Sequence, residues 1–178
     1  MHYACESGHT ELISFLLHQG TDIRTRDAEG MNAMHTAAKH GSTKVMDLLM
    51  TNDMEIDVED ATKWTPLHHA CCAGQNATVS YLLEKKANVN QKNANEETPL
   101  HLAFGNGHME IIRLLLQADP PADKELKDNI GYTPMKYATI ELAERMATHA
   151  GWGEEAAQTN HMESTDAEES APSKCSVS

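Results

Sequence analysis

The sequence has few aromatic and few basic residues, and it has no long apolar segment. Aromatic residues make up 4% of the 178 residues, and 14 lysines and arginines stand against 27 aspartates and glutamates, for a formal net charge of −13. Nucleic-acid binding depends on lysine and arginine side chains that neutralise phosphates, so this balance argues against a nucleic-acid partner. No apolar run approaches the roughly 18 residues of a membrane span. Polar residues also interrupt the first segment, so no signal peptide is predicted.

Cysteines and catalytic motifs are also sparse. The chain contains no glycine-rich phosphate-binding loop with a lysine and no His-Glu-x-x-His sequence, so we expect no enzyme activity and no cofactor. The four cysteines show neither a disulfide framework nor zinc-ligand spacing, and we expect them to be reduced in a cytoplasmic protein. They are Cys5, Cys71, Cys72 and Cys175.

What the sequence does contain is a repeat of 33 residues. Alanines, glycines and pairs of bulky apolar residues recur in one register with four histidines, His2, His35, His68 and His101. A fixed period of this size is typical of stacked units, each of which buries its apolar face against a neighbour. Such stacks present extended surfaces rather than enclosed pockets, which favours a binding function.

Each unit is predicted to contain two short helices. Thr65 is a good N-cap, and Pro66 suits the first helical position because its missing N–H needs no partner there. Val79, Leu82 and Leu83 then recur at the i, i+3, i+4 spacing of a helix that faces a core. Residues 88–97 are rich in asparagine, which predicts a polar loop with turns between units.

The openings of the units resemble those of a known family. Thr65-Pro66-Leu67-His68 recurs 33 residues later with the same four residue types, and Gly-His-x-Glu follows the first helix in two units. This pattern is similar to the ankyrin repeat. The resemblance implies an all-α solenoid of helix-turn-helix units with β-turn or hairpin loops, formed by residues 1–150. Its units are expected at 1–30, 31–63, 64–96, 97–131 and 132–150. Residues 151–178 form an acidic tail that we expect to be disordered.

Three units depart from the pattern. In the second, Asn32 stands where others have threonine and no proline follows, which predicts a weaker cap. The fourth unit is two residues longer, since Thr98 and Thr133 are 35 residues apart, so its loop should bulge. The fifth unit has Lys136 in place of the repeated histidine, and its polar end at residues 141–146 is expected to cap the stack.

The resemblance implies that partners bind along the loop tips and the exposed side of the first helices. Trp64 is the strongest candidate there, because exposed tryptophans are frequent hot spots of interfaces. The alternative for Trp64 is packing between adjacent loops. The whole predicted strip consists of Met31, Lys39, His40, Trp64, Cys72, Ala73, Glu97, Asn106 and Tyr132.

The eleven histidines do not predict a metal site. Zinc requires ligand nitrogens about 2.0 Å from one ion, whereas equivalent residues of stacked helices lie roughly 8–10 Å apart. The resemblance implies that the repeated histidine makes a structural hydrogen bond near the turn. The only denser cluster, His68-His69 with Cys71-Cys72, lies on one helix whose neighbouring side chains point apart, so no metal is expected.

Three residues are candidates for modification. The last four residues, which begin with Cys175, fit the C-a-a-X box for a farnesyl group. The following serine is not aliphatic and the flanking segment is acidic, so an unmodified surface cysteine is the alternative. Thr165 precedes an acid at the spacing of an acid-directed kinase site. Asn90 follows a valine and has a leucine eight residues before it, a pattern that, by the resemblance, an asparaginyl hydroxylase accepts.

These features predict a non-catalytic, monomeric adaptor that binds a protein partner and associates partly with membranes through Cys175. One alternative is that the chain is the C-terminal portion of a larger signalling or enzyme-targeting protein, since Met1 stands where Leu67 lies inside a helix. The other is a stand-alone enzyme, which the missing motifs disfavour.

Overall fold

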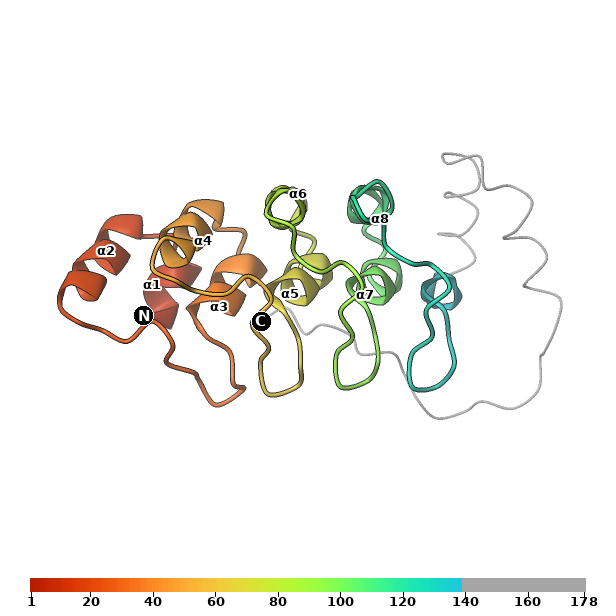
Figure 1. The fold of residues 1–178 in the computed structure, drawn as a ribbon, viewed down its shortest axis with the longest axis horizontal. Coiled ribbons are helices and arrows are strands. Elements are labelled where there is room, and N and C mark those ends of the chain that lie inside the picture. Colours follow the sequence, from red (N-terminus) through yellow and green to blue (C-terminus); the bar gives the residue numbers. More distant parts are fainter. Residues whose placement is uncertain (139–178) are drawn as a thin grey trace, which may run out of the picture.

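The computed structural model describes residues 1–138, which form a row of helix pairs joined by long loops (Figure 1). The pairs are α1 (His2–Glu6) with α2 (Thr10–His18), α3 (Ala33–Lys39) with α4 (Thr43–Met50), α5 (Pro66–Cys72) with α6 (Asn76–Glu84), and α7 (Pro99–Gly105) with α8 (Met109–Leu116). A short 3-10 helix, η1 (Pro134–Tyr137), begins a fifth unit. The predicted end cap and acidic tail lie outside the described residues.

The helices form two layers, and the loops project together on one side (Figure 1). The first helices contact one another in the order α1, α3, α5, α7 and η1, and the second helices in the order α2, α4, α6 and α8. Each unit therefore packs mainly against its immediate neighbours, as the repeat predicted. No helix within residues 1–138 is long and apolar enough to cross a membrane.

The start of α3 corrects one expectation. Asn32 is a full N-cap, because its Oδ1 accepts hydrogen bonds from the backbone nitrogens of Met34 at 3.0 Å and His35 at 3.3 Å. Asparagine ranks with the best capping residues. The weaker cap predicted for the second unit is therefore not found.

The two extra residues of the fourth unit lie directly after α8. In the third unit the backbone nitrogen of Ala87 bonds to the carbonyl of Leu82, five residues earlier. The equivalent bond of the fourth unit joins Ala122 to Leu115, seven residues earlier. The predicted bulge is confirmed, and the stacking register on both sides of it is kept.

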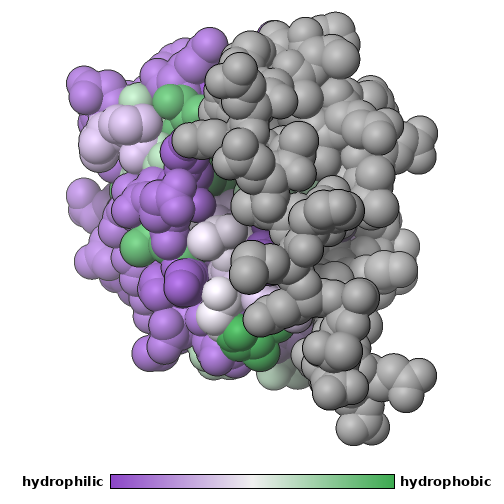
Figure 2. Space-filling model, turned by 90° about the vertical axis from the view of Figure 1, so that its right-hand side faces the viewer, coloured by the Kyte–Doolittle hydropathy of each residue, from purple (hydrophilic) through white to green (hydrophobic). Residues whose placement is uncertain are grey.

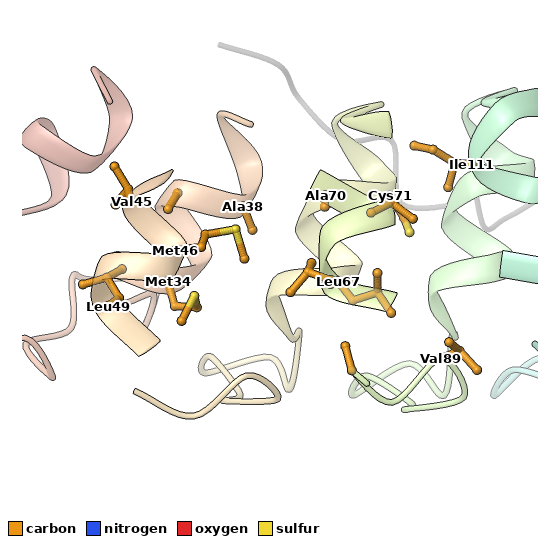
Figure 3. Packing of buried hydrophobic residues seen from close by; sticks show 14 of the residues in the cluster. Met34, Ala38, Val45, Met46, Leu49, Leu67, Ala70, Cys71, Val89 and Ile111 are labelled. Atoms are coloured by element: carbon orange, nitrogen blue, oxygen red, sulfur yellow. The ribbon is translucent and has the colours of Figure 1, made fainter. Parts of the chain in front are cut away.

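The buried apolar core runs from the first unit to the fourth, and Figure 3 shows part of it. Leu82 is fully buried, as the helical spacing predicted, whereas Leu83, which the same spacing placed on the core side, is only partly buried. Small residues such as Ala70 on the first helices allow neighbouring units to approach closely. Cys5 and Cys71 are free and fully buried, and burial raises the pKa of the Cys5 thiol to about 11. Both positions are parts of the core rather than reactive thiols.

The tip of the first loop needs a glycine for two reasons, which predicts a large effect of Gly30→Ala. Gly30 has φ +76°, and a Cβ there would lie 2.6 Å from the backbone nitrogen of Ala61 on the next loop. The left-handed backbone alone should cost about 1–2 kcal/mol, and the clash about 1–3 kcal/mol more. Urea unfolding of the variant measures the sum of these two losses.

Gly131→Ala is the matched control for this prediction. Gly131 has φ +83° at the equivalent place of a later loop, but a Cβ there would have nothing within 4 Å. Gly131→Ala should therefore show only the smaller, conformational loss. Equal losses of unfolding free energy in the two variants would mean that the close approach of the first two loops does not contribute to the effect of Gly30→Ala.

Candidate interaction surface

One histidine in each of the first four units connects that unit to the loop that leads into the next unit. The ring Nε2 of each bonds to a backbone carbonyl 29 or 31 residues later, at distances of 3.0 to 3.2 Å. The pairs are His2 with Met31, His35 with Trp64, His68 with Glu97 and His101 with Tyr132. The four carbonyls belong to residues of the predicted strip, so this histidine ladder holds the strip in place.

The last three rings of the ladder are held in the neutral form. Nδ1 of His68 accepts from the backbone nitrogen of Thr65 at 3.1 Å, and Nδ1 of His101 accepts from Thr98 at 3.0 Å, so only Nε2 carries a proton. Burial lowers the pKa of His35 and of His68 to about 4, although the bonds to the carbonyls oppose this shift. Burial also lowers the pKa of His101. These rings are therefore structural, as expected from the family resemblance.

A second repeated residue closes each loop tip. Asp60 Oδ1 accepts from the backbone nitrogens of Thr62 at 2.8 Å and Trp64 at 2.9 Å. Asp27, Asn93 and Asp128 make the same pair of bonds in the other loops. These residues were not predicted from the sequence, although the first three are 33 residues apart, as the histidines are, and Asp128 follows 35 residues after Asn93 because the fourth unit is two residues longer. The repeat could therefore have identified them.

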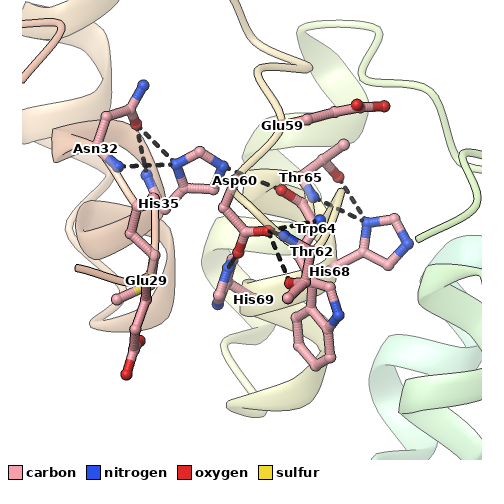
Figure 4. Close-up of polar contacts among 12 residues, drawn as sticks. Glu29, Asn32, His35, Glu59, Asp60, Thr62, Trp64, Thr65, His68 and His69 are labelled. Atoms are coloured by element: carbon pink, nitrogen blue, oxygen red, sulfur yellow. Dashed lines mark hydrogen bonds and ion pairs between the residues drawn. The ribbon is translucent and has the colours of Figure 1, made fainter. Parts of the chain in front are cut away.

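Asp60 also forms a hydrogen-bonded ion pair with His69 on α5 (Figure 4). Its Oδ2 lies 2.9 Å from Nε2 of His69, and the side chains are 5% and 13% exposed respectively. Burial alone would raise the pKa of Asp60, but hydrogen bonds from His69, Thr62 and Trp64 hold it well below its usual range. The tip of the loop between α4 and α5 is thus tied to α5 by a largely buried, ionised carboxylate.

Trp64 lies against this network and is half-buried. Its ring centroid is 5.1 Å from that of His69 and 6.0 Å from that of His68, both on α5. The backbone nitrogen and carbonyl of Trp64 are both hydrogen-bonded, to Asp60 and His35. The indole therefore rests on the rings of its own unit with a fixed backbone and a partly exposed face.

The other residues of the predicted strip differ in how exposed their side chains are. His40 and Tyr132 are exposed, whereas Met31, Lys39, Ala73 and Asn106 are half-buried. Cys72 and Glu97 are buried, at 6% and 3% exposure, so the expectation of an exposed side chain does not hold for these two. The Glu97 carboxylate accepts a bond from Asn93 at 2.8 Å, and the Cys72 carbonyl accepts one from His108 of the next unit at 3.2 Å.

Asn90 joins two neighbouring loops. Its Oδ1 accepts from the backbone nitrogen of Asp123 at 2.8 Å, and its Nδ2 donates to the carbonyl of Pro121 at 3.4 Å. Asp57 makes the corresponding contact one unit earlier, with the backbone nitrogen of Asn88 at 3.1 Å. A hydroxylase would therefore have to draw the Asn90 side chain out of these contacts, and its hydroxylation stays a prediction.

Residues of the first two loops, among them Arg26 and Gly30 of the first loop, line a cavity of about 600 Å³. Its walls are rich in carboxylates, but Asp57 and Glu59 already accept bonds from Asn88 and Gln91, and Arg26 donates to the carbonyl of Glu59. No group of three or more histidine, cysteine or acidic side chains within residues 1–138 is arranged to hold a metal ion. The cavity is therefore lined mainly by charged loop residues, and none of its lining residues is a serine, threonine, cysteine or lysine nucleophile.

Comparison with known families agrees with this architecture. A family model described as ankyrin repeats (3 copies) matches residues 1–93, and a second, described as ankyrin repeats (many copies), matches residues 82–138. A comparison with curated proteins found no match. The two models together cover every helix pair of the described stack, and the first alone covers more than half of the chain. The chain belongs to the ankyrin repeat family.

Proposed function

We propose that this chain is a non-catalytic adaptor that binds a protein partner along the strip centred on Trp64. Ankyrin repeats generally mediate protein–protein interactions. The observation that carries the proposal is a partly exposed tryptophan on a hydrogen-bonded loop tip in the middle of the stack. Aromatic side chains of this kind are common binding hot spots.

Rigidity of the strip supports a binding role. Both the histidine ladder and the aspartates of the loop tips fix the backbone next to Trp64. A surface that is ordered before binding loses less conformational entropy when a partner docks. The side chains of Cys72 and Glu97 are buried, so they are not part of the proposed contact surface.

Trp64→Ala should weaken partner binding by roughly 1–3 kcal/mol, because it removes the aromatic contact. Quantitative mass spectrometry of proteins captured by the full chain, followed by titration of the captured partner, measures this loss. Trp64→Phe keeps an aromatic ring against His69 and should lose less. Arg113→Ala, an exposed change on α8 outside the strip, is the control and should leave binding unchanged.

The stability of the Trp64 variants separates binding from folding. Because the ring is half-buried, Trp64→Ala should lower the melting temperature only moderately. A large fall in melting temperature together with unchanged partner affinity would show that Trp64 serves packing alone, and the adaptor strip would then have to be placed elsewhere.

The lipid anchor and the cytoplasmic location are further parts of the proposal. Cys175 and Thr165 lie outside the described residues, so both modifications rest on the sequence pattern alone. One farnesyl chain gives only marginal membrane binding. The residues after Gly151 contain six acids and one lysine, which anionic lipid headgroups repel.

Cys175→Ser should move the whole protein into the soluble fraction of eukaryotic cells, whereas the unchanged chain should divide between membrane and cytosol. High salt should increase the bound share, because it screens the repulsion between the acidic tail and the lipids. Cell fractionation measures this division. Intact-mass analysis that finds an unmodified chain still ending in Ser176-Val177-Ser178 would rule out the anchor.

A further inference from the structure

Trp64 rests on a pair of side chains that the neighbouring units lack (Figure 4). The Oδ2 of Asp60 lies 2.9 Å from Nε2 of His69, and the centroid of the indole lies 5.1 Å from that of the His69 ring, at an interplanar angle of 51°. One period before and after His69, the first helices carry Thr36 and Leu102. The repeat therefore does not require a histidine here, and the pair is particular to the unit that presents Trp64.

One ring nitrogen of His69 is accessible to water. Nε2 is bonded to Asp60, and Nδ1 has no hydrogen-bond partner within the part of the chain that the structure describes. Among the described residues, Oγ1 of Thr78 is the only buried side-chain nitrogen or oxygen atom without a partner, so Nδ1 of His69 is not sealed from solvent. Histidine ordinarily changes charge between pH 5 and 8. The ring can therefore gain a proton at Nδ1 and keep its bond to Asp60.

A proton on His69 faces one ionised carboxylate and two neutral rings. Burial alone would raise the pKa of Asp60, but its hydrogen bonds hold it well below its usual range, so this carboxylate is ionised. Burial lowers the pKa of His35 and of His68 to about 4, so both rings are neutral near pH 7, and the centroid of the His35 ring lies 5.4 Å from that of His69. The hydrogen bonds, ion pairs and ring contacts of His69 involve none of the other titratable groups on α5, on the loop before it or on the helices that contact it, which are Lys39 on α3, Asp53, Glu55, Asp57, Glu59 and Lys63 on the loop, Cys71 and Cys72 on α5, Tyr81 and Glu84 on α6, and His101 on α7.

We propose that His69 is a positioning residue that makes the orientation of Trp64 depend on pH. A cation within about 6 Å of an aromatic ring is attracted to the face of that ring, and the protonated ring of His69 is such a cation, held in place by Asp60. Protonation therefore holds the indole against α5 in the orientation that Figure 4 shows, whereas loss of the proton leaves only the packing of two uncharged rings. The indole is then less firmly placed.

The orientation of Trp64 bears on partner binding. Seen from the end of the stack that carries η1, the visible surface of the described residues is largely hydrophilic (Figure 2), and aromatic residues make up 4% of the chain, so few other side chains could replace an indole as a contact. A side chain that is ordered before binding loses less conformational entropy when a partner docks. A partner should therefore bind roughly two- to fivefold more tightly when His69 is protonated, the factor that corresponds to a cation–π contact at an exposed site. This regulation rests on the proposed function, whereas the position of Trp64 can be measured without a partner.

The fluorescence of Trp64 in the full chain tests the proposal, because a protonated imidazole beside an indole quenches its emission. The chain has two tryptophans, and Trp152→Phe leaves Trp64 as the only one. The emission of this variant should rise in one step as the pH is raised from about 5 to about 8. His69→Gln should remove the step, since its amide can donate to Asp60 but cannot titrate. His18→Gln, an exposed change on α2, is the control and should leave the step unchanged.

Asp60→Asn tests the contribution of the carboxylate charge. Asn93 closes the next loop tip with the same two backbone bonds, so the tip of the variant should stay closed. The step in emission should move to lower pH, because the charge that favours the proton is gone. Circular dichroism confirms that each variant is folded.

Titration of a captured partner near pH 6 and near pH 8 completes the test. Equal affinity at the two pH values, or the same pH dependence in His69→Gln, overturns the regulation. Emission without a step, or a step that persists in His69→Gln, overturns the positioning role. A step that vanishes in His69→Gln while the full chain captures no partner supports the positioning role and contradicts the adaptor function alone.

Discussion

Lowering the pH from 6.5 to 4 should reduce the free energy of unfolding by roughly 3 kcal/mol for each of His35 and His68, at about 1.4 kcal/mol per pKa unit. Both rings are fully buried, and burial lowers the pKa of each from 6.5 to about 4. His101 should add to the loss in the same direction. This is the largest effect that we expect from solution conditions alone.

The sign of the effect follows from proton binding. In the unfolded chain a histidine binds a proton near pH 6.5, whereas in the folded chain His68 stays neutral until about pH 4. The unfolded state therefore binds more protons between these values, and stability falls as the pH falls. Burial raises the pKa of Asp57, so this carboxyl group makes the folded state more stable as the pH falls. It is a single half-buried group, and we expect the three ladder histidines with lowered pKa values to outweigh it.

Urea unfolding at a series of pH values between 7 and 4 measures this dependence. His68→Gln should be less stable at neutral pH but should show a shallower decline, because one of the titrating rings is gone. His40→Gln changes an exposed histidine and should keep the slope of the unchanged protein. A stability that stays flat from pH 6.5 to pH 4 would contradict the neutral ladder.

Leu82→Ala should lower the free energy of unfolding by roughly 2–5 kcal/mol, because it leaves a cavity at a fully buried position. Leu82 is 0% exposed on α6 and belongs to the continuous core. The loss should affect neighbouring units as well, since each unit of a solenoid is stabilised by its interfaces. Urea unfolding followed by circular dichroism measures it.

Leu83→Ala is the matched control for this core prediction. Leu83 is the next residue on the same helix but is only partly buried, so its truncation should cost clearly less. Equal losses for the two leucines, or a Leu82→Ala variant as stable as the unchanged chain, would contradict the orientation of α6 in the stack.

The sequence alone determined the architecture of the described stack. The 33-residue period, the Thr-Pro openings and the spacing of residues such as Leu82 are local patterns, and each one appears in the structure as a unit boundary, a helix start or a buried face. The two extra residues before Thr133 were also visible as a break in the period. Such features depend on residues within one unit, so they can be predicted without knowing how the units meet.

Only the tertiary structure decided which residues of the strip are exposed. The hydrogen bonds that anchor Trp64 and Cys72 come from His35 and His108, which lie 29 and 36 residues away. The burial of Glu97 depends in the same way on the placing of adjacent units. Contacts between units decide whether a side chain faces a partner or a neighbouring unit. These contacts depend on how the helices of different units are placed relative to one another, and a local sequence pattern does not give that placement.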